Sequence, residues 1–244
     1  MKIIPAVDLL DGGVVRLTEG DYARAKSYAE ASLQEIATRC AKLRIGTLHV
    51  VDLNRARGEE TNVNESILIQ TMSKISIRIQ CGGGVRTAQK AKALLNAGVA
   101  KVIVGTAAAA DPAFLQNLKE SVGPDRVIVG ADVRDGAIMI HGWQETAPIG
   151  LDSFIDDAMK SGYRQFLITD ISRDGKLAGI DPAFYEKIAG EHRGIEIIAS
   201  GGVSSMDDIR KLSGAGVSGV VVGKALYEGK ITLEEIGEWN RAGG

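Results

Sequence analysis

The sequence contains little of what marks several protein classes. Among 244 residues there are 2 cysteines, 5 prolines and 5% aromatic residues, and the formal net charge is −2. Two cysteines without a CxxC pair exclude a disulfide framework and a zinc ribbon. We therefore expect Cys40 and Cys81 to be reduced, partly buried side chains. Balanced charge without a basic stripe argues against a nucleic-acid partner.

Long apolar runs are absent as well. No run approaches the ~18 residues that a membrane span needs, so we expect no membrane association. The first residues, Met1-Lys2-Ile3, lack the layout of a signal peptide, because a strand-like run ending in Asp8 follows them. A cytoplasmic protein is the expectation. Glycine is abundant, at 30 residues, and is expected in loops and at close backbone approaches.

What the chain does contain is a regular alternation of short Val/Ile runs with helical patterns. The runs are continuous, as is typical of parallel strands buried on both faces. The expected strands are Ile3–Asp8, Thr47–Asp52, Ile77–Gln80, Lys101–Val104, Arg126–Asp132, Arg164–Asp170, Glu196–Ser200 and Gly219–Val222. Eight strand–helix units in this length predict a (β/α)8 TIM barrel, with residues 1–244 as one domain.

Helix starts and loops can also be placed. Helices are expected over Ala31–Leu43, Asn64–Ile75, Pro112–Val122, Leu151–Lys160 and Thr232–Trp239, with others opening at Thr87, Asp181 and Ser205. Ser205 and Asp208 have the spacing of a capping box. A long loop is expected to run from Asp8 through Tyr28, and a small hairpin around Asp135-Gly136 in a loop that reaches Trp143.

An internal repeat supports the barrel. Gly83-Gly84-Val85 and Gly201-Gly202-Val203 are 118 positions apart, and the glycines, valines and alanines that follow match at the same offset up to Ala107 and Ala225. Asp52 and Asp170 share that offset. The barrel is therefore expected to be a doubled half-barrel, with halves of about 1–122 and 123–244. A doubly wound open sheet would not predict this match.

The repeated glycines point to phosphate binding. Glycine-rich turns after strands let backbone N–H groups close on an anion, and the last two strand–helix loops of TIM barrels are the usual phosphate site. The candidate phosphate-binding residues are Gly201, Gly202, Gly223 and Lys224 in one half and Gly83, Gly84, Arg86, Gly105 and Thr106 in the other. Two such sites imply a substrate with a phosphate at each end. Alternatively, the glycines only permit tight strand–helix packing. Arg16 either reaches a phosphate or is exposed and unpaired.

Four expected strands end in aspartate, on the face where TIM barrels carry their catalytic residues. Asp8 and Asp132 follow strands on opposite sides of the ring, and so do Asp52 and Asp170. Either pair could supply one acid that donates a proton and one base that abstracts it. The spacing does not choose between the pairs, and each aspartate could instead cap a loop.

Other chemistries have weak signals. His49 lies inside an expected strand and is interpreted as a satisfied core residue, whereas His141 lies beside Trp143 in a loop, where a role in the site stays open. The sequence has no His/carboxylate cluster with metal spacing, no GxSxG and no GxGxxG. Acid–base chemistry without a metal or cofactor is what remains.

At these residues the chain resembles the histidine-biosynthesis isomerase family that acts on N′-[(5′-phosphoribosyl)formimino]-5-aminoimidazole-4-carboxamide ribonucleotide. The resemblance spans nearly the whole chain. Its matching stretches include Ile4-Pro5-Ala6-Val7-Asp8, Gly20-Asp21-Tyr22, His49-Val50-Val51-Asp52-Leu53, Gly82-Gly83-Gly84-Val85-Arg86, Val104-Gly105-Thr106-Ala107, Asp132-Val133-Arg134-Asp135-Gly136, Gly142-Trp143, Thr169-Asp170-Ile171-Ser172-Arg173-Asp174-Gly175, Ala199-Ser200-Gly201-Gly202-Val203 and Gly223-Lys224-Ala225-Leu226-Tyr227.

The resemblance implies an Amadori rearrangement, from aldose to ketose, on a substrate with a phosphate at each end. Separately, we expect a monomer that uses no cofactor. It gives Asp8 the role of general base and Asp132 that of the acid that opens the ribose ring, with Thr169 assisting. Trp143, Asp174 and Gly175 are implied to bind substrate. Two departures from the family pattern are Asn54, where many relatives carry Asp, and Cys81, which replaces an aliphatic residue.

Three alternatives stay open. An isomerase that also handles phosphoribosylanthranilate would share these residues. The related cyclase of the same pathway shares the doubled barrel and two acids, but its relatives typically begin with Cys-Leu-Asp where this chain has Ala6-Val7-Asp8. A non-catalytic phosphosugar-binding module is the third, and the presence of both Asp8 and Asp132 argues against it.

Overall fold

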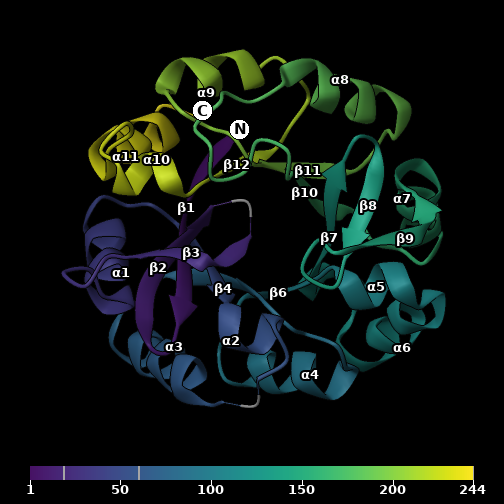
Figure 1. Ribbon diagram of the computed structural model, residues 1–244, viewed down its shortest axis with the longest axis horizontal. Coiled ribbons are helices and arrows are strands. Elements are labelled where there is room, and N and C mark those ends of the chain that lie inside the picture. Colours follow the sequence, from purple (N-terminus) through teal and green to yellow (C-terminus); the bar gives the residue numbers. More distant parts are fainter. Residues whose placement is uncertain (19, 60, 244) are drawn as a thin grey trace.

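The computed structural model describes residues 1–18, 20–59 and 61–243, and in these the parallel strands close into a barrel (Figure 1). The eight barrel strands are β1 (Lys2–Leu10), β4 (Thr47–Asp52), β5 (Arg78–Gly82), β6 (Lys101–Val104), β7 (Val127–Arg134), β10 (Gln165–Asp170), β11 (Glu196–Ser200) and β12 (Gly219–Val222). Each pairs with the next in this order, and β12 pairs with β1 to close the ring. The (β/α)8 prediction is confirmed. Glu19, Glu60 and Gly244, which the expected domain includes, lie outside the described residues.

Helices surround the barrel, one after each strand (Figure 1). They are α1 (Leu33–Lys42), α3 (Val63–Lys74), α4 (Ala88–Asn96), α6 (Pro112–Val122), α7 (Leu151–Lys160), α8 (Pro182–Glu191), α9 (Met206–Leu212) and α11 (Leu233–Arg241). Shorter turns of helix are α2 (Leu53–Ala56), α5 (Thr106–Ala110), α10 (Lys224–Tyr227) and the 3-10 turn η1 (Pro124–Arg126). The expected capping box is present, since Ser205 caps α9 and Asp208 reaches back to it. α1 begins at Leu33, two residues later than expected, because Ser32 caps it.

Apolar side chains fill both sides of the barrel wall, which explains the continuous Val/Ile runs of the sequence. The larger cluster lies between strands and helices, and a second cluster fills the barrel interior with Ile4, Ala6, Ile103, Ile128, Leu167, Ile198 and Val221. Cys40 and Cys81 are free, as expected, and are fully rather than partly buried.

One polar pair lies buried among these side chains. His49 on β4 is opposite Gln80 on β5, and the Gln80 Nε2 atom is 3.0 Å from His49 Nδ1. Burial lowers the pKa of His49 to about 3, and the nearby charge of Arg16 adds to that effect. The imidazole is therefore neutral at physiological pH, and its interpretation as a satisfied core group is confirmed.

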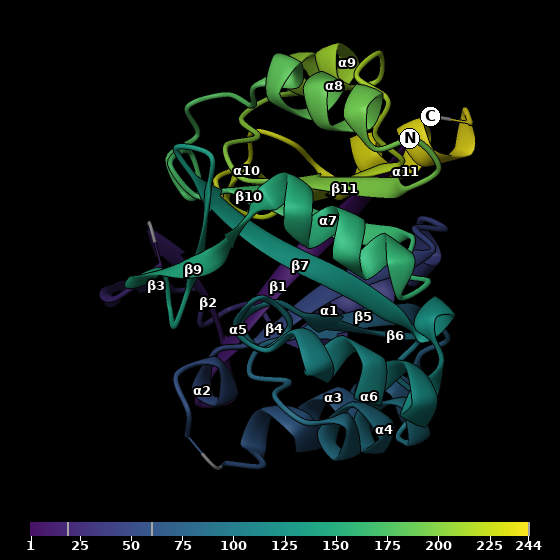
Figure 2. The ribbon, with the colours of Figure 1, turned by 90° about the vertical axis from the view of Figure 1, so that its right-hand side faces the viewer.

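Two antiparallel hairpins extend the sheet at one end of the barrel. They are β2 (Gly13–Thr18) with β3 (Asp21–Ser27), and β8 (Ala137–Ile140) with β9 (Glu145–Gly150). The first replaces the long loop expected before Tyr28, and β9 extends the second beyond the expected small hairpin. Figure 2 shows both hairpins at the end of the barrel opposite the chain termini. This end, where the barrel strands finish, is the barrel mouth.

The internal repeat is visible in the backbone of the strand ends. Gly83 and Gly201 have φ of +93° and +94°. A Cβ on either would overlap the carbonyl oxygen of the equivalent residue, Asp52 or Asp170. Short helices α5 and α10 follow the equivalent glycines Gly105 and Gly223. The two halves thus repeat the same local structure at these positions.

In the described part of the chain, no helix combines the length and the apolar character that crossing a membrane requires.

Candidate active site at the barrel mouth

Asp8 lies at the mouth, near the end of β1, in an ion pair with Arg16 on β2. The Arg16 Nη1 atom is 2.9 Å from Asp8 Oδ2, and both side chains are largely buried. Burial raises the pKa of Asp8 to about 6, although Arg16 opposes the increase and Asp174 adds to it. A carboxyl group with this pKa is ionised at neutral pH yet basic enough to accept a proton. The alternative that Arg16 is exposed and unpaired is wrong.

Asp132 lies near the end of β7, on the far side of the ring, and its carboxylate is held by two donors. The Trp143 indole Nε1 donates to Asp132 Oδ2 at 2.7 Å. The Thr169 side chain, opposite Asp132 on β10, forms a second hydrogen bond. The pKa of Asp132 is nevertheless raised, because burial outweighs the effect of these donors. Strands β1 and β7 therefore each present one carboxyl group with a raised pKa.

Trp143 also connects two loops across the mouth. It has a φ of +67°, and its indole ring lies against Gly20, where a Cβ would come within 2.7 Å of Cε3. Gly20 belongs to the β2–β3 connection, on the Asp8 side of the site. The resemblance implied a binding role for Trp143, but no sequence pattern predicted its contact with Gly20.

Asp52 and Asp170, the other expected pair, hold their own loops. Asp52 is 3% exposed, caps α2 through the Arg55 N–H at 3.1 Å and accepts from Asn64 Nδ2 at 2.8 Å. Asp170 accepts hydrogen bonds from the backbone and side chain of Ser172. The capping interpretation therefore describes Asp52 and Asp170 in this structure.

Asp174 is a third acid at the site, in the loop after β10. Burial raises its pKa, while Arg16 and Lys224 lower it. Its charge raises the pKa values of both Asp8 and Asp132, so it lies within electrostatic reach of each. The Lys224 Nζ donates to the Gly175 carbonyl at 2.6 Å, which fixes the loop that carries Asp174. Residue patterns alone did not single out Asp174; only the resemblance did.

The glycines of the β11 and β12 loops converge as predicted. With Lys224, Arg16 and Asp174 they line one small cavity, whose glycine members are Gly175, Gly201, Gly202 and Gly223. Gly202 also packs tightly, because a Cβ there would overlap the Gly179 carbonyl oxygen. The contacts show that these glycines permit tight packing. That packing does not prevent them from binding an anion, which stays a prediction.

Of the equivalent loops after β5 and β6, the first is packed against α2. A Cβ on Gly84 would overlap the Arg55 carbonyl, and the Arg86 guanidinium donates to the carbonyls of Arg55 at 3.2 Å and Ala56 at 2.7 Å. Gly105 and Thr106 lie at the start of α5. Arg86 thus binds the end of α2 in this structure, and its phosphate role stays a prediction.

Asn54, whose identity departs from the family pattern, has a clear structural role. Its Nδ2 donates to Asp11 Oδ1 and Glu59 Oε2, each at 2.6 Å, and its Oδ1 accepts from the Asp11 N–H. Asn64 joins this network and donates to Asn54 and to the Leu9 carbonyl. The network fixes the turn that follows β1, directly beyond Asp8.

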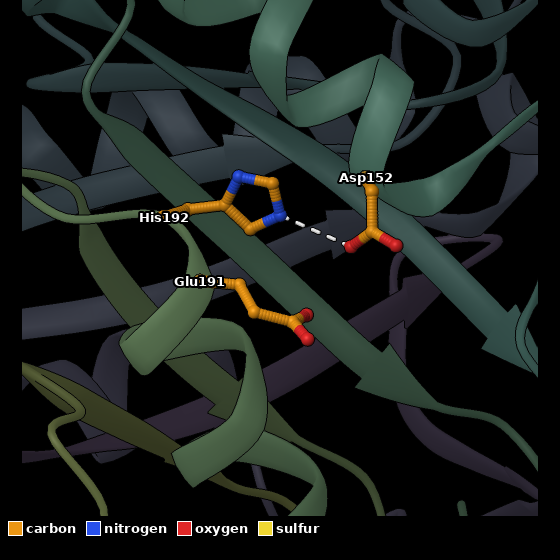
Figure 3. A group of neighbouring side chains, drawn as sticks. All are labelled: Asp152, Glu191 and His192. Carbon is orange, nitrogen blue, oxygen red and sulfur yellow. Dashed lines mark hydrogen bonds and ion pairs between the residues drawn. The ribbon is translucent and has the colours of Figure 1, made fainter.

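One group of potential metal ligands lies away from the mouth (Figure 3). Asp152 of α7 meets Glu191 and His192 at the end of α8. His192 is 6% exposed, and its Nε2 and Nδ1 lie 3.0 and 3.1 Å from carboxylate oxygens of Asp152 and Asp156. The sequence did not reveal this group because its members are about 40 positions apart. Both ring nitrogens therefore already have carboxylate partners. His141, by contrast, is exposed at the mouth with a φ of +52°.

The comparison with known families found one match. The model of a family described as histidine biosynthesis protein matches residues 2–232 of this chain.

Proposed function

The chain belongs to this family of histidine biosynthesis enzymes, and we propose that its reaction is an Amadori rearrangement that converts an aldose to a ketose. The proposed substrate is N′-[(5′-phosphoribosyl)formimino]-5-aminoimidazole-4-carboxamide ribonucleotide. The observation that supports this most is the pair Asp8 and Asp132. These two carboxyl groups lie on opposite sides of the barrel mouth, and each has a raised pKa.

The proposed reaction begins with acid catalysis by Asp132. Its protonated carboxyl group donates a proton to the ring oxygen of the ribose, the bond from C1 to that oxygen breaks, and the nitrogen lone pair forms an iminium at C1. The raised pKa makes the protonated form of Asp132 easier to reach than that of an ordinary aspartate. Thr169 and Trp143 hold the carboxylate that results, because both donate to it.

Asp8 then acts as the base. Its carboxylate removes the proton from C2, and the electron pair moves to form an enolamine. This becomes the 2-keto product once C1 takes up a proton and the 2-hydroxyl group loses its own. In the protein without substrate, Arg16 pairs with Asp8 and lowers its pKa. These steps need no oxidant or reductant, because the two carbons exchange oxidation state within one molecule. The enzyme would therefore be an intramolecular oxidoreductase that interconverts aldoses and ketoses.

The duplicated loops would bind the two ends of the substrate. One phosphate is assigned to the cavity lined by Gly202, Gly223 and Lys224, and the other to the equivalent loops with Gly84 and Gly105. These loops flank the axis from Asp8 to Asp132, so a substrate anchored at both would place its middle between the acids. Arg16 lines the first cavity and belongs to the same proposal.

The test is an assay of the purified protein on three reactions in parallel. Turnover of the imidazole carboxamide ribonucleotide to its ketose is expected. Additional turnover of phosphoribosylanthranilate would extend the function to a bifunctional isomerase. Ring closure with glutamine or ammonia would instead identify the cyclase of the pathway. Binding of the phosphosugar without any turnover would favour the non-catalytic module and would overturn the isomerase proposal.

A further inference from the structure

Arg16 occupies space that an anion would need. Its Nη2 lies directly over Gly223, so that a Cβ on that glycine would overlap the guanidinium. The remaining cavity along the β11 and β12 loops has a free volume of about 20 Å³. That volume holds about one water molecule. A phosphate, with its four oxygens, does not fit beside the guanidinium, so its entry requires Arg16 to move.

The guanidinium is also incompletely satisfied where it lies. Its Nη1 pairs with Asp8, but among the described residues the buried Nε has no hydrogen-bond partner. An unpaired buried donor on a charged group is costly, so this position is held mainly by Asp8. A stronger anion in reach of Nε would compete for the guanidinium.

A second, larger cavity has room for the displaced Arg16 side chain. It has a volume of about 470 Å³, and Arg16 is among the residues that line it. Arg16 and Lys224 line both cavities, and the larger one adds Lys26, Lys230 and Glu228. The guanidinium therefore forms part of the wall between them. A rotation of this long side chain away from Gly223 opens the small cavity without any movement of the backbone.

We propose that Arg16 is a plug that an incoming phosphate displaces, and that its displacement breaks the ion pair with Asp8. The proposal rests on the assignment of a phosphate to the β11 and β12 loops in the proposed function. In the free protein the guanidinium fills the phosphate position and neutralises Asp8. With a dianion bound, Arg16 contacts the dianion, and Asp8 is left buried without its counter-ion.

The chemical consequence follows from the groups that face Asp8. Arg16 is the one that lowers its pKa, whereas burial and Asp174 raise it. Other ionisable side chains within electrostatic reach of Asp8 or Arg16 are Tyr22 from β3, Tyr28 just after it, His49 from β4, and Tyr227 from α10. Loss of the guanidinium therefore raises the pKa of Asp8 above about 6 and makes it a stronger base once the substrate phosphate is in place.

The experiment measures the titration of Asp8 directly and needs no substrate. Protein labelled with ¹³C at the aspartate carboxyl carbons is titrated by NMR with and without inorganic sulfate, which keeps its double charge throughout. The Asp8 signal is assigned by its loss in Asp8→Asn. We expect sulfate to raise the pKa of Asp8 by about 1 to 3, the usual effect of one adjacent charge. The Arg16 Nε resonance should move at the same sulfate concentration.

Two variants separate displacement from simple repulsion between sulfate and Asp8. In Arg16→Ala, the pKa of Asp8 without sulfate should already equal the raised value of the sulfate-bound wild type. Sulfate should then raise it only slightly further. In Gly223→Ala, whose new methyl group pushes the guanidinium off the loop, the pKa of Asp8 should rise without any anion. An equal response to sulfate in the wild type and Arg16→Ala would overturn the proposal, and so would sulfate binding that leaves Asp8 unchanged or no sulfate binding at all. None of these outcomes depends on turnover. A negative isomerase assay can therefore be distinguished from a negative result for the displacement of Arg16.

Discussion

The indole Nε1 of Trp143 lies 2.7 Å from Oδ2 of Asp132, the short distance typical of a hydrogen bond to a charged acceptor. The same indole ring packs on Gly20 at the opposite side of the mouth. The contact thus ties the proposed acid to the loop beside the proposed base. It also provides a side chain that can be altered without removing either acid.

We predict that Trp143→Phe moves the pH dependence of turnover to higher pH. Trp143 lowers the pKa of Asp132 by donating to its carboxylate, so loss of the N–H raises that pKa. An acid that must be protonated then works up to a higher pH, and the alkaline limb of the profile shifts upward. The lost bond to a charged group also costs about 1.5–3 kcal/mol, or roughly 10- to 100-fold in rate if it is made in the transition state.

The control is Trp239→Phe. The Trp239 Nε1 donates to the Met1 carbonyl at the end of the barrel that carries the termini. Its removal should leave the pH profile in place. An unshifted alkaline limb in Trp143→Phe would show that the indole does not act on the catalytic acid.

We predict that Asp8→Asn and Asp132→Asn each abolish turnover while the protein folds and binds its substrate. An amide neither accepts a proton from C2 nor donates one to the ring oxygen, so losses of at least the 10²–10⁴-fold typical of acid–base groups are expected. Circular dichroism and calorimetric binding of substrate check folding and affinity. Asp207→Asn is the matched control, because Asp207 is exposed and pairs with Lys211 on the surface. If Asp8→Asn or Asp132→Asn kept a near-normal kcat, the altered residue would not be a catalytic acid or base.

The sequence was sufficient for the barrel because each strand carries its own signal. A run such as Lys101–Val104 is apolar on both faces, and a helical pattern follows it. β3 carries no such signal, since its residues are mostly exposed and polar. It is held by pairing with β2 and by the Tyr22 hydroxyl, which donates to the Leu53 carbonyl 31 positions away. A contact of that range has no local pattern to reveal it.

The same distinction applies to the site. Strand-end aspartates are local features, and all four were found. The choice between Asp8 and Asp52 was not possible from spacing, because it depends on partners elsewhere in the chain. Asp52 meets Asn64, whereas Asp8 meets Arg16, which in turn lies on Gly223. Arg16 is buried between the first and last barrel strands only because the ring closes. Its partners are too far apart in the sequence for a local pattern to predict this.

We predict that Gly201→Ala lowers the free energy of unfolding by at least about 3 kcal/mol. Its φ of +94° strains any L-residue, and its Cβ would overlap the Asp170 carbonyl, which cannot move without shifting β10. Gly190→Ala is the matched control. Gly190 lies in α8 with open space around its Cα, so alanine should stabilise the helix by about 0.5–1 kcal/mol. Urea unfolding measures both, and a Gly201→Ala protein as stable as the wild type would contradict the close packing of the loop on β10.

Finally, we predict that Asp8 and His49 give the stability of the protein opposite pH dependences that partly cancel. Asp8 has a pKa of about 6 in the folded protein and 3.8 as its ordinary value, so between these values the folded state binds more protons. Its contribution to stability is therefore present below pH 3.8 and is lost as the pH rises through 6, by up to about 3 kcal/mol. His49 behaves oppositely. Its pKa is about 3 when folded and 6.5 ordinarily, so the unfolded state binds more protons and stability rises with pH between these values.

Single variants should separate the two slopes. In His49→Gln the effect of the imidazole is lost, whereas Asp8, Asp132 and Asp174 keep their raised pKa values, so the free energy of unfolding should fall as the pH rises from 4 to 6. In Asp8→Asn the effect of Asp8 is lost and that of His49 remains, so stability should rise with pH more steeply than in the wild type. Each substitution also changes stability by an amount that does not depend on pH, because Asp8→Asn leaves Arg16 without its partner and His49→Gln disturbs Gln80. The slope of unfolding free energy against pH, from urea titrations at pH 4, 5, 6 and 7, is therefore the decisive quantity. Parallel slopes in all three proteins would mean that neither group titrates abnormally in the folded barrel.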